Sequence, residues 1–184
     1  MFQKLAKTLT FLLLLTGAAA TSSAQALSGE DIKAQFIKDW ERAKLYTQEY
    51  LNAMPADKYS AKPVDSIRTF AQQMLHLAYD NVNLISLSTG EKSGNFPGRD
   101  LEKSSTAQSK DSVVYYVDES YDYAIQSIKK FDPNKFGELV GKAPRQVTRF
   151  AWLLKAFEHQ THHRGQTTIY IRLVGVKPPQ EKLF

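Results

Sequence analysis

The chain of 184 residues contains no cysteine, and this absence removes several classes of function at once. It excludes disulfides, thiolate metal ligands, thiol nucleophiles and a lipid-modified cysteine at the N-terminus. A chain of this length still buries a substantial core in one domain without covalent cross-links. The absence of cysteine is therefore compatible with a stable protein outside the cell.

Long apolar runs are also missing, apart from a short one near the start. Lys4 and Lys7 precede the apolar stretch 9–16 (LTFLLLLT), and Ala24-Gln25-Ala26 supplies a small-x-small cleavage pattern. This order is typical of a secretory signal peptide. An uncleaved membrane anchor is the alternative, but the run is far shorter than the roughly 20 residues that a membrane-spanning helix needs. We therefore predict that residues 1–26 form a cleaved signal peptide.

Export sets the expected location of the remaining chain. Residues 27–184 are predicted to be a single periplasmic or secreted domain with no stable membrane insertion.

The charge of the chain is mild and mixed. It has 24 Lys and Arg and 19 Asp and Glu, a net charge of +5, and both signs are interspersed along the sequence. A nucleic-acid-binding protein usually has a dense basic stripe. Nucleic acid is therefore not an expected partner.

Four segments carry apolar residues at the three- and four-residue spacing of an amphipathic helix. No convincing strand accompanies them. The β-branched run 113–117 resembles a strand, but the apolar residues that follow it continue at helical spacing, so we predict a helix there. Four such helices in one domain predict an all-α fold, a four-helix bundle. The expected helices cover residues 31–54, 66–89, 111–131 and 144–174.

Local signals place the ends of these helices. Ser28 resembles the start of a capping box, Asp65 or Ser66 suits the N-cap of the second helix, and Gly90 suits its end. Pro144 suits the first turn of the last helix. Two linkers remain, and the longer, 91–110, has no periodicity and is predicted to be a functional lid or a mobile connector.

The four histidines fall in only two of the expected helices. His159 and His163 are one turn apart and project about 40° apart on one helix face, so both rings can bind one metal ion. The alternative is a pair of histidines with ordinary hydrogen bonds. His162 points to the other side and could face solvent. His76 lies in the second helix, but its angle to the apolar arc places it at a boundary or on the polar side of that helix.

Several neighbours of the histidines have two interpretations each. Asp80 follows His76 by one turn and is either an acceptor for an imidazole N–H or an ordinary surface charge. Gln166 lies near the direction of His159 and either lines the site or is a surface amide. Glu158 and Arg164 project away from the His159 face, so we expect them to form inter-helix or surface pairs.

Two stretches of the sequence resemble the DinB/YfiT-like family of metal-binding four-helix proteins. The stronger match is residues 158–166 (EHQTHHRGQ), followed by 170–175 (YIRLVG) and Pro178-Pro179. The looser match is residues 58–81 (KYSAKPVDSIRTFAQQMLHLAYDN), in which a histidine follows a Lys-Pro pair and a capped helix start. The resemblance covers the second and fourth expected helices.

The resemblance implies a metal site with three ligands, His76, His159 and His163. It also implies one divalent metal ion, with zinc or nickel the first candidates. Three neutral histidines with an open position are typical of a catalytic zinc site. The expected function is a metal-dependent hydrolase or a thiol-dependent transferase acting on a small molecule. The alternative is a non-catalytic metal-binding or protein-interaction module, and a homodimer is expected because such bundles commonly dimerise.

Overall fold

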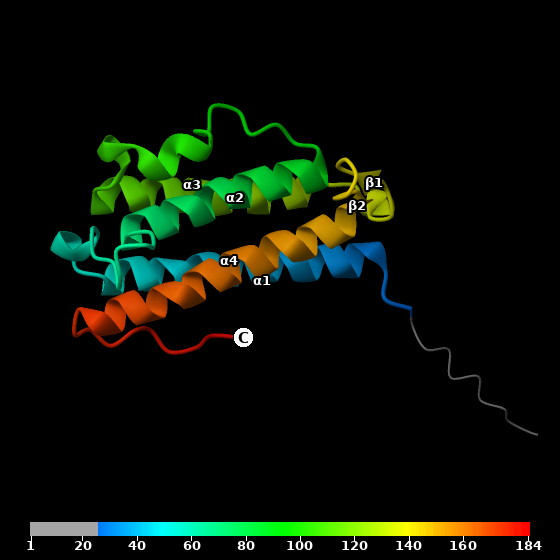
Figure 1. Cartoon of the computed structure of the whole chain (residues 1–184). Helices are drawn as coiled ribbons and strands as arrows, with labels where there is room; N and C mark the ends of the chain where they lie inside the picture. The colour runs from blue at the N-terminus through cyan, green and yellow to red at the C-terminus, as the bar shows by residue number, and fades with distance from the viewer. Residues whose placement is uncertain (1–25) are drawn as a thin grey trace, which may run out of the picture.

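The computed structural model describes residues 26–184, which fold mainly into four long α-helices (Figure 1). The helices lie side by side along a common direction, and α2 packs chiefly against α3 and α4. This arrangement confirms the predicted all-α helical bundle. The helices are α1 (Gly29–Ala53), α2 (Phe70–Thr89), α3 (Lys110–Lys130) and α4 (Arg149–Leu173).

The predicted signal peptide, residues 1–26, lies outside the described residues except for its last position. Its cleavage therefore stays a prediction. Within residues 26–184, no helix combines the length and apolar character needed to cross a bilayer.

The helix starts follow side-chain caps. The predicted capping box at Ser28 is present, with the Asp31 amide donating to the Ser28 side chain and the Asp31 carboxylate accepting from the Ser28 amide. The second helix begins later than predicted. Thr69 forms its capping box with Gln72, so Ser66 lies in the preceding loop. Gly90 ends that helix with a φ of 84°, a left-handed conformation that favours glycine.

The fourth helix also begins later than predicted, and the reason is a short hairpin. Strands β1 (Leu139–Val140) and β2 (Val147–Thr148) pair antiparallel, so Pro144 lies in the hairpin loop and not in a helical turn. At Gly141 a side chain would place its Cβ 2.6 Å from the Arg145 carbonyl oxygen. The loop therefore closes tightly enough to require glycine there, and α4 starts only after Thr148, its N-cap.

The long linker is less irregular than its sequence suggested. It contains two short 3₁₀ helices, η2 (Arg99–Lys103) and η3 (Ser105–Ala107), and two more, η1 (Ala56–Lys58) and η4 (Pro133–Lys135), occur elsewhere. Leu101 and Ala107 are buried, which anchors the linker to the bundle. The η2 segment lies against α2, so the linker brings its own side chains to the second helix.

The core beneath the histidines combines aromatic packing with a buried polar network. Trp40 is fully buried and packs edge-on against Tyr121 and Phe157. The Tyr121 hydroxyl donates to Gln160 Oε1, which also accepts from Arg164 Nη1 at 2.8 Å. Arg164 is only 5% exposed, and its guanidinium carbon lies 4.6 Å from the centre of the Tyr46 ring.

Arg164 therefore forms the inter-helix contact that its angle on the helix predicted. Its Nη1 also lies 3.3 Å from Thr47 Oγ1 on α1. The network fixes the rotation of α4 and thereby the direction of the histidines on its other face.

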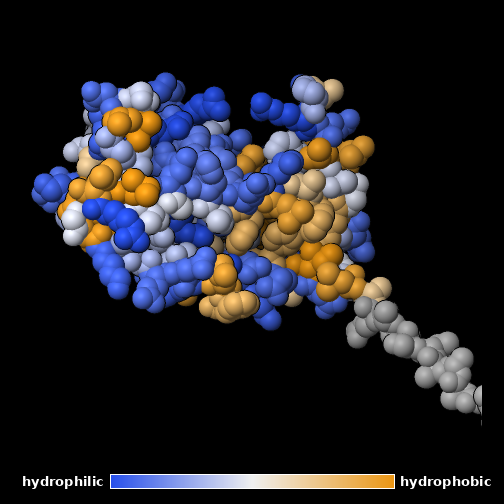
Figure 2. Space-filling view, turned by 60° about the horizontal axis from the view of Figure 1, so that its bottom comes forward, coloured by the Kyte–Doolittle hydropathy of each residue, from blue (hydrophilic) through white to orange (hydrophobic). Residues whose placement is uncertain are grey.

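An apolar patch is exposed at the end of the bundle where α1 and α4 begin (Figure 2). A groove of about 690 Å³ lies there, with Leu27 and Leu154 among its exposed members and Phe36, Phe150 and Phe157 forming its floor.

Candidate metal centre

Three histidines from two neighbouring helices converge at one point. His76 comes from the middle of α2, and His159 and His163 come from successive turns of α4. One ring nitrogen from each lies within 4.8 Å of the other two. The ring centres are 4.3 Å apart for His159 and His163, and 4.6 Å apart for His76 and His163. The structure thus brings together the three residues that the family resemblance implied as ligands.

Asp80 holds two of these rings on their Nε2 side. Its Oδ2 atom lies 3.3 Å from Nε2 of His76 and 3.2 Å from Nε2 of His159. The carboxylate is only 13% exposed. Of its two interpretations, the contact with imidazole N–H is the one that the structure supports, and the solvated surface charge is wrong.

Glu102 holds the opposite side of the His76 ring. Its Oε2 atom lies 3.1 Å from Nδ1 of His76 and 3.0 Å from Nε of Arg68. A carboxylate that accepts the Nδ1–H of a histidine fixes its tautomer and leaves Nε2 free for a metal. Glu102 belongs to η2, so the long linker completes the site.

Gln73 contacts Nδ1 of His163, as Glu102 contacts Nδ1 of His76. The Gln73 amide lies 2.6 Å from Nδ1 of His163 and also contacts the Gln166 amide. Either end of an amide can face a ring nitrogen, so its oxygen can accept the Nδ1–H of His163 and leave Nε2 for a metal. Gln166 lines the site, and its amide lies 3.0 Å from Nε2 of His162, which is exposed as predicted.

Burial keeps two of the rings uncharged at neutral pH. Burial, followed by the nearby charges of His159 and His76, lowers the pKa of His163 to about 3. Burial and the Arg68 guanidinium lower the pKa of His76. The pKa of Asp80 is below its usual value, because the hydrogen bond and the charge of His159 outweigh the effect of burial. His76 and His163 are thus neutral and Asp80 is ionised, the protonation states that metal binding requires.

These residues fit a divalent metal ion. Imidazole nitrogen is a ligand type that zinc and nickel prefer. The Glu102 carboxylate faces Nδ1 of His76, and the Gln73 amide faces Nδ1 of His163. Nδ1 of His159 is buried without a hydrogen-bond partner among residues 26–184. Three imidazoles crowded this closely gain little from one another, whereas one shared cation could bind all three.

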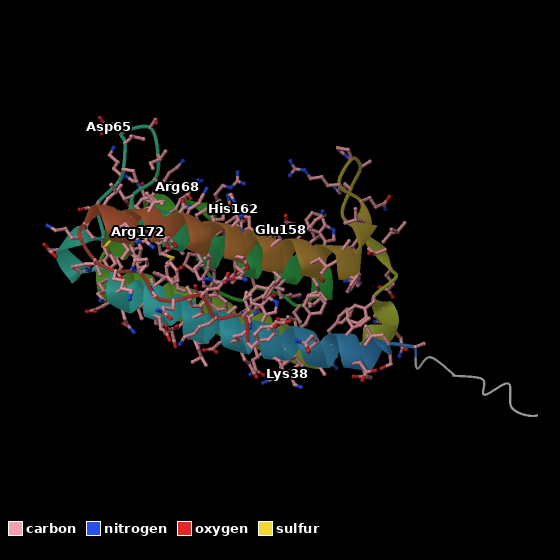
Figure 3. All side chains as sticks on the ribbon, turned by 90° about the horizontal axis from the view of Figure 1, so that it is seen from below. Lys38, Asp65, Arg68, Glu158, His162 and Arg172 are labelled. Atoms are coloured by element: carbon pink, nitrogen blue, oxygen red, sulfur yellow. The ribbon has the colours of Figure 1, made fainter. Side chains whose placement is uncertain are left out.

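Cavities lie on both sides of the centre. The larger, about 890 Å³, is lined by His163, Gln73, Gln166 and the loop before α2. The labelled side chains Arg68 and His162 lie close together on this face of the molecule (Figure 3). The smaller cavity, about 420 Å³, is lined by Asp80, His159 and Trp152. A small molecule can therefore reach the centre from the His163 side.

Replacing Glu102 with alanine is expected to weaken metal binding roughly 10- to 100-fold, the usual effect of losing the acceptor behind a histidine ligand. The Nδ1–H of His76 would lose its acceptor, and Arg68 would lose its carboxylate partner. Competition titration of zinc against a chromophoric chelator measures the change. Glu119→Ala, an exposed acid on α3, is the matched control. Equal affinities in the two variants would contradict the role given to Glu102.

Comparisons with known proteins agree with the resemblance inferred from the sequence. The chain is 24% identical over 151 residues to the uncharacterized protein YrdA of Bacillus subtilis strain 168, covering 78% of this chain and 84% of that protein. Crystal structures of DinB-like proteins also resemble this chain. One, a DinB-like protein from Bacillus cereus ATCC 10987, has a TM-score of 0.64 at 18% identity and covers 81% of this chain and 97% of its own.

Another, the DinB-like protein YjoA from Bacillus subtilis, has a TM-score of 0.61 at 18% identity, and the match covers 82% of this chain and 96% of that protein. At such identities these structures support the fold alone. The family model described as DinB family matches residues 23–183. The chain therefore belongs to the DinB family.

Proposed function

We propose that this protein is an exported DinB-family enzyme that uses one divalent metal ion to act on a small molecule. The observation that carries the proposal is the convergence of three histidines beside a cavity of about 890 Å³. Three histidines with access from a pocket are the arrangement of a catalytic metal site. Zinc and nickel are the proposed ions.

The residues around the centre have distinct roles in this proposal. Glu102 and Gln73 fix the rings of His76 and His163 so that Nε2 faces the ion. The cavity lining includes Arg68, Lys103 and amide groups as well as Ile169 and Tyr170, which suits a small molecule that has polar and apolar parts. A divalent ion held there would supply Lewis acidity and lower the pKa of a water or thiol that it binds.

Two reaction classes fit this chemistry, hydrolysis and thiol-dependent transfer. Thiol cofactors are concentrated in a reducing cytoplasm, so the proposed export favours hydrolysis. Periplasmic or secreted location and a homodimer stay predictions, as does the absence of nucleic acid from the partners.

The alternative is a module that binds metal without catalysis. The contact of Asp80 with two rings favours it, because a fourth protein group at the centre reduces the room for substrate. An enzyme must offer a coordination position that a small molecule can reach from the cavity.

That position can be tested before a substrate is known. Cobalt-substituted protein titrated with a small thiol is expected to develop a thiolate-to-cobalt charge-transfer band. Ile67→Trp, at the mouth of the cavity, should weaken thiol binding and leave the cobalt content unchanged. A spectrum that responds neither to the thiol nor to acetohydroxamate would overturn the proposal of an enzyme and favour the non-catalytic module.

A further inference from the structure

Asp80 holds a position that differs from those of Glu102 and Gln73. The latter two contact Nδ1 atoms, those of His76 and His163. Asp80 Oδ2 instead contacts Nε2 of His76 and Nε2 of His159, which belong to different helices. Two rings that point their Nε2 atoms at one oxygen mark the point where they converge. Asp80 therefore stands at the centre, not behind it.

Metal binding changes the partners of this oxygen. Without an ion, Asp80 Oδ2 faces Nε2 of both rings, while Nδ1 of His76 faces Glu102. An ion needs the lone pairs of both Nε2 atoms, so neither atom can offer Asp80 an N–H once the ion is bound. A carboxylate that is only 13% exposed then needs a positive charge close by. The bound ion is the cation available to it.

The distances fit direct coordination. Zinc bonds of about 2.0–2.1 Å hold ligand atoms about 3.4 Å apart in a tetrahedron. The Asp80 oxygen already lies 3.3 and 3.2 Å from two of the three nitrogens. We propose that Asp80 is a fourth protein ligand, which gives a centre of three histidines and one aspartate. This inference rests on the proposed metal binding.

The position of Asp80 leaves a route for a small molecule. Asp80 and His159 border the smaller cavity, whereas His163 borders the larger one. The carboxylate therefore closes the His159 side of the ion. Zinc can expand to five ligands during reaction, so a substrate can still enter from the His163 side.

The test compares Asp80→Ala and Asp80→Asn with Glu158→Gln, which removes a neighbouring negative charge that is exposed on α4 (Figure 3). Zinc affinity is measured by chelator competition, and circular dichroism checks that each variant folds. Loss of a group behind the ligands costs about 10- to 100-fold. Asp80→Ala is expected to lose more than this, Asp80→Asn somewhat less, and Glu158→Gln about threefold at most.

Cobalt absorption gives a second readout that a purely structural role would not move. Asp80→Ala is expected to change the visible cobalt spectrum, and added acetate should shift it back towards that of the unmodified protein by supplying the missing carboxylate. An unchanged cobalt spectrum in Asp80→Ala, with or without a loss of affinity, would overturn the inference. Absence of zinc uptake by the unmodified protein would overturn the metal-binding proposal itself, and with it this inference.

Discussion

Replacing His159 with alanine is expected to abolish the thermal stabilisation that zinc gives to this protein. A ligand that binds only the folded state, at about 1,000 times its dissociation constant, stabilises by about 4 kcal/mol. For a domain of this size, that corresponds to a rise of roughly 8–16 °C in melting temperature. His159 supplies one of the three converging nitrogens and also contacts Asp80. Without it, His76 and His163 remain as the only histidines of the centre.

The measurement is the melting temperature with zinc and with a chelator, for the unmodified protein and the variant. His162→Ala is the matched control, because His162 is exposed and lies outside the three-histidine group. The control is expected to keep the zinc-dependent rise, and the metal-free forms should melt within a few degrees of one another. A full zinc-dependent rise in His159→Ala would show that His159 is not a ligand.

Replacing Trp40 with alanine is expected to destabilise the metal-free protein by about 3–5 kcal/mol, the usual cost of removing a large aromatic side chain from a core. Trp40 is fully buried, and its ring centre lies 5.6 Å from that of Tyr121 and 5.8 Å from that of Phe157. It therefore joins α1 to α3 and α4. The cavity left behind would be bordered by three helices that the bundle already holds in place, so it could collapse only in part.

Urea unfolding, followed by circular dichroism in the presence of a chelator, measures this loss. Leu45→Ala is the control on the same helix, since Leu45 is 63% exposed and such surface changes usually stay within about 0.5 kcal/mol. If Trp40→Ala unfolds at the same urea concentration as Leu45→Ala, the described core is wrong.

Much of the fold follows from the periodicity of the sequence. Phe36, Trp40 and Tyr50 are spaced as on one face of an amphipathic helix, and all three are buried in the core. The helix starts were harder to predict, because several residues near each start are suitable caps. Thr69 forms the cap of α2 although Asp65 and Ser66 are equally suitable by residue type. The choice depends on how the preceding loop packs.

The start of α4 could not be predicted for a related reason. Proline is common in the first turn of a helix, but it is also common in turns. Pro144 lies in a hairpin whose strands have only two residues each. So short a pairing leaves no alternation to detect in the sequence.

The site could be predicted only in part. The spacing of His159 and His163 on one helix reports their common face, but no spacing links them to His76 on another helix. The resemblance supplied that link, and the geometry now agrees with it. Glu102 gave no signal at all, because it reaches His76 from a linker without periodicity. Gln73 lies three residues before His76, about one helical turn away, so helical spacing alone could have indicated it as a neighbour of the site.

Metal content per chain is the most direct test of the central claim. The mature protein should be purified without a histidine tag, beside the His76→Ala variant, and both analysed by inductively coupled plasma mass spectrometry. The account predicts about one divalent ion per chain in the unmodified protein and almost none in the variant. A folded, unmodified protein that contains no metal and takes up none on titration with zinc or nickel would contradict it.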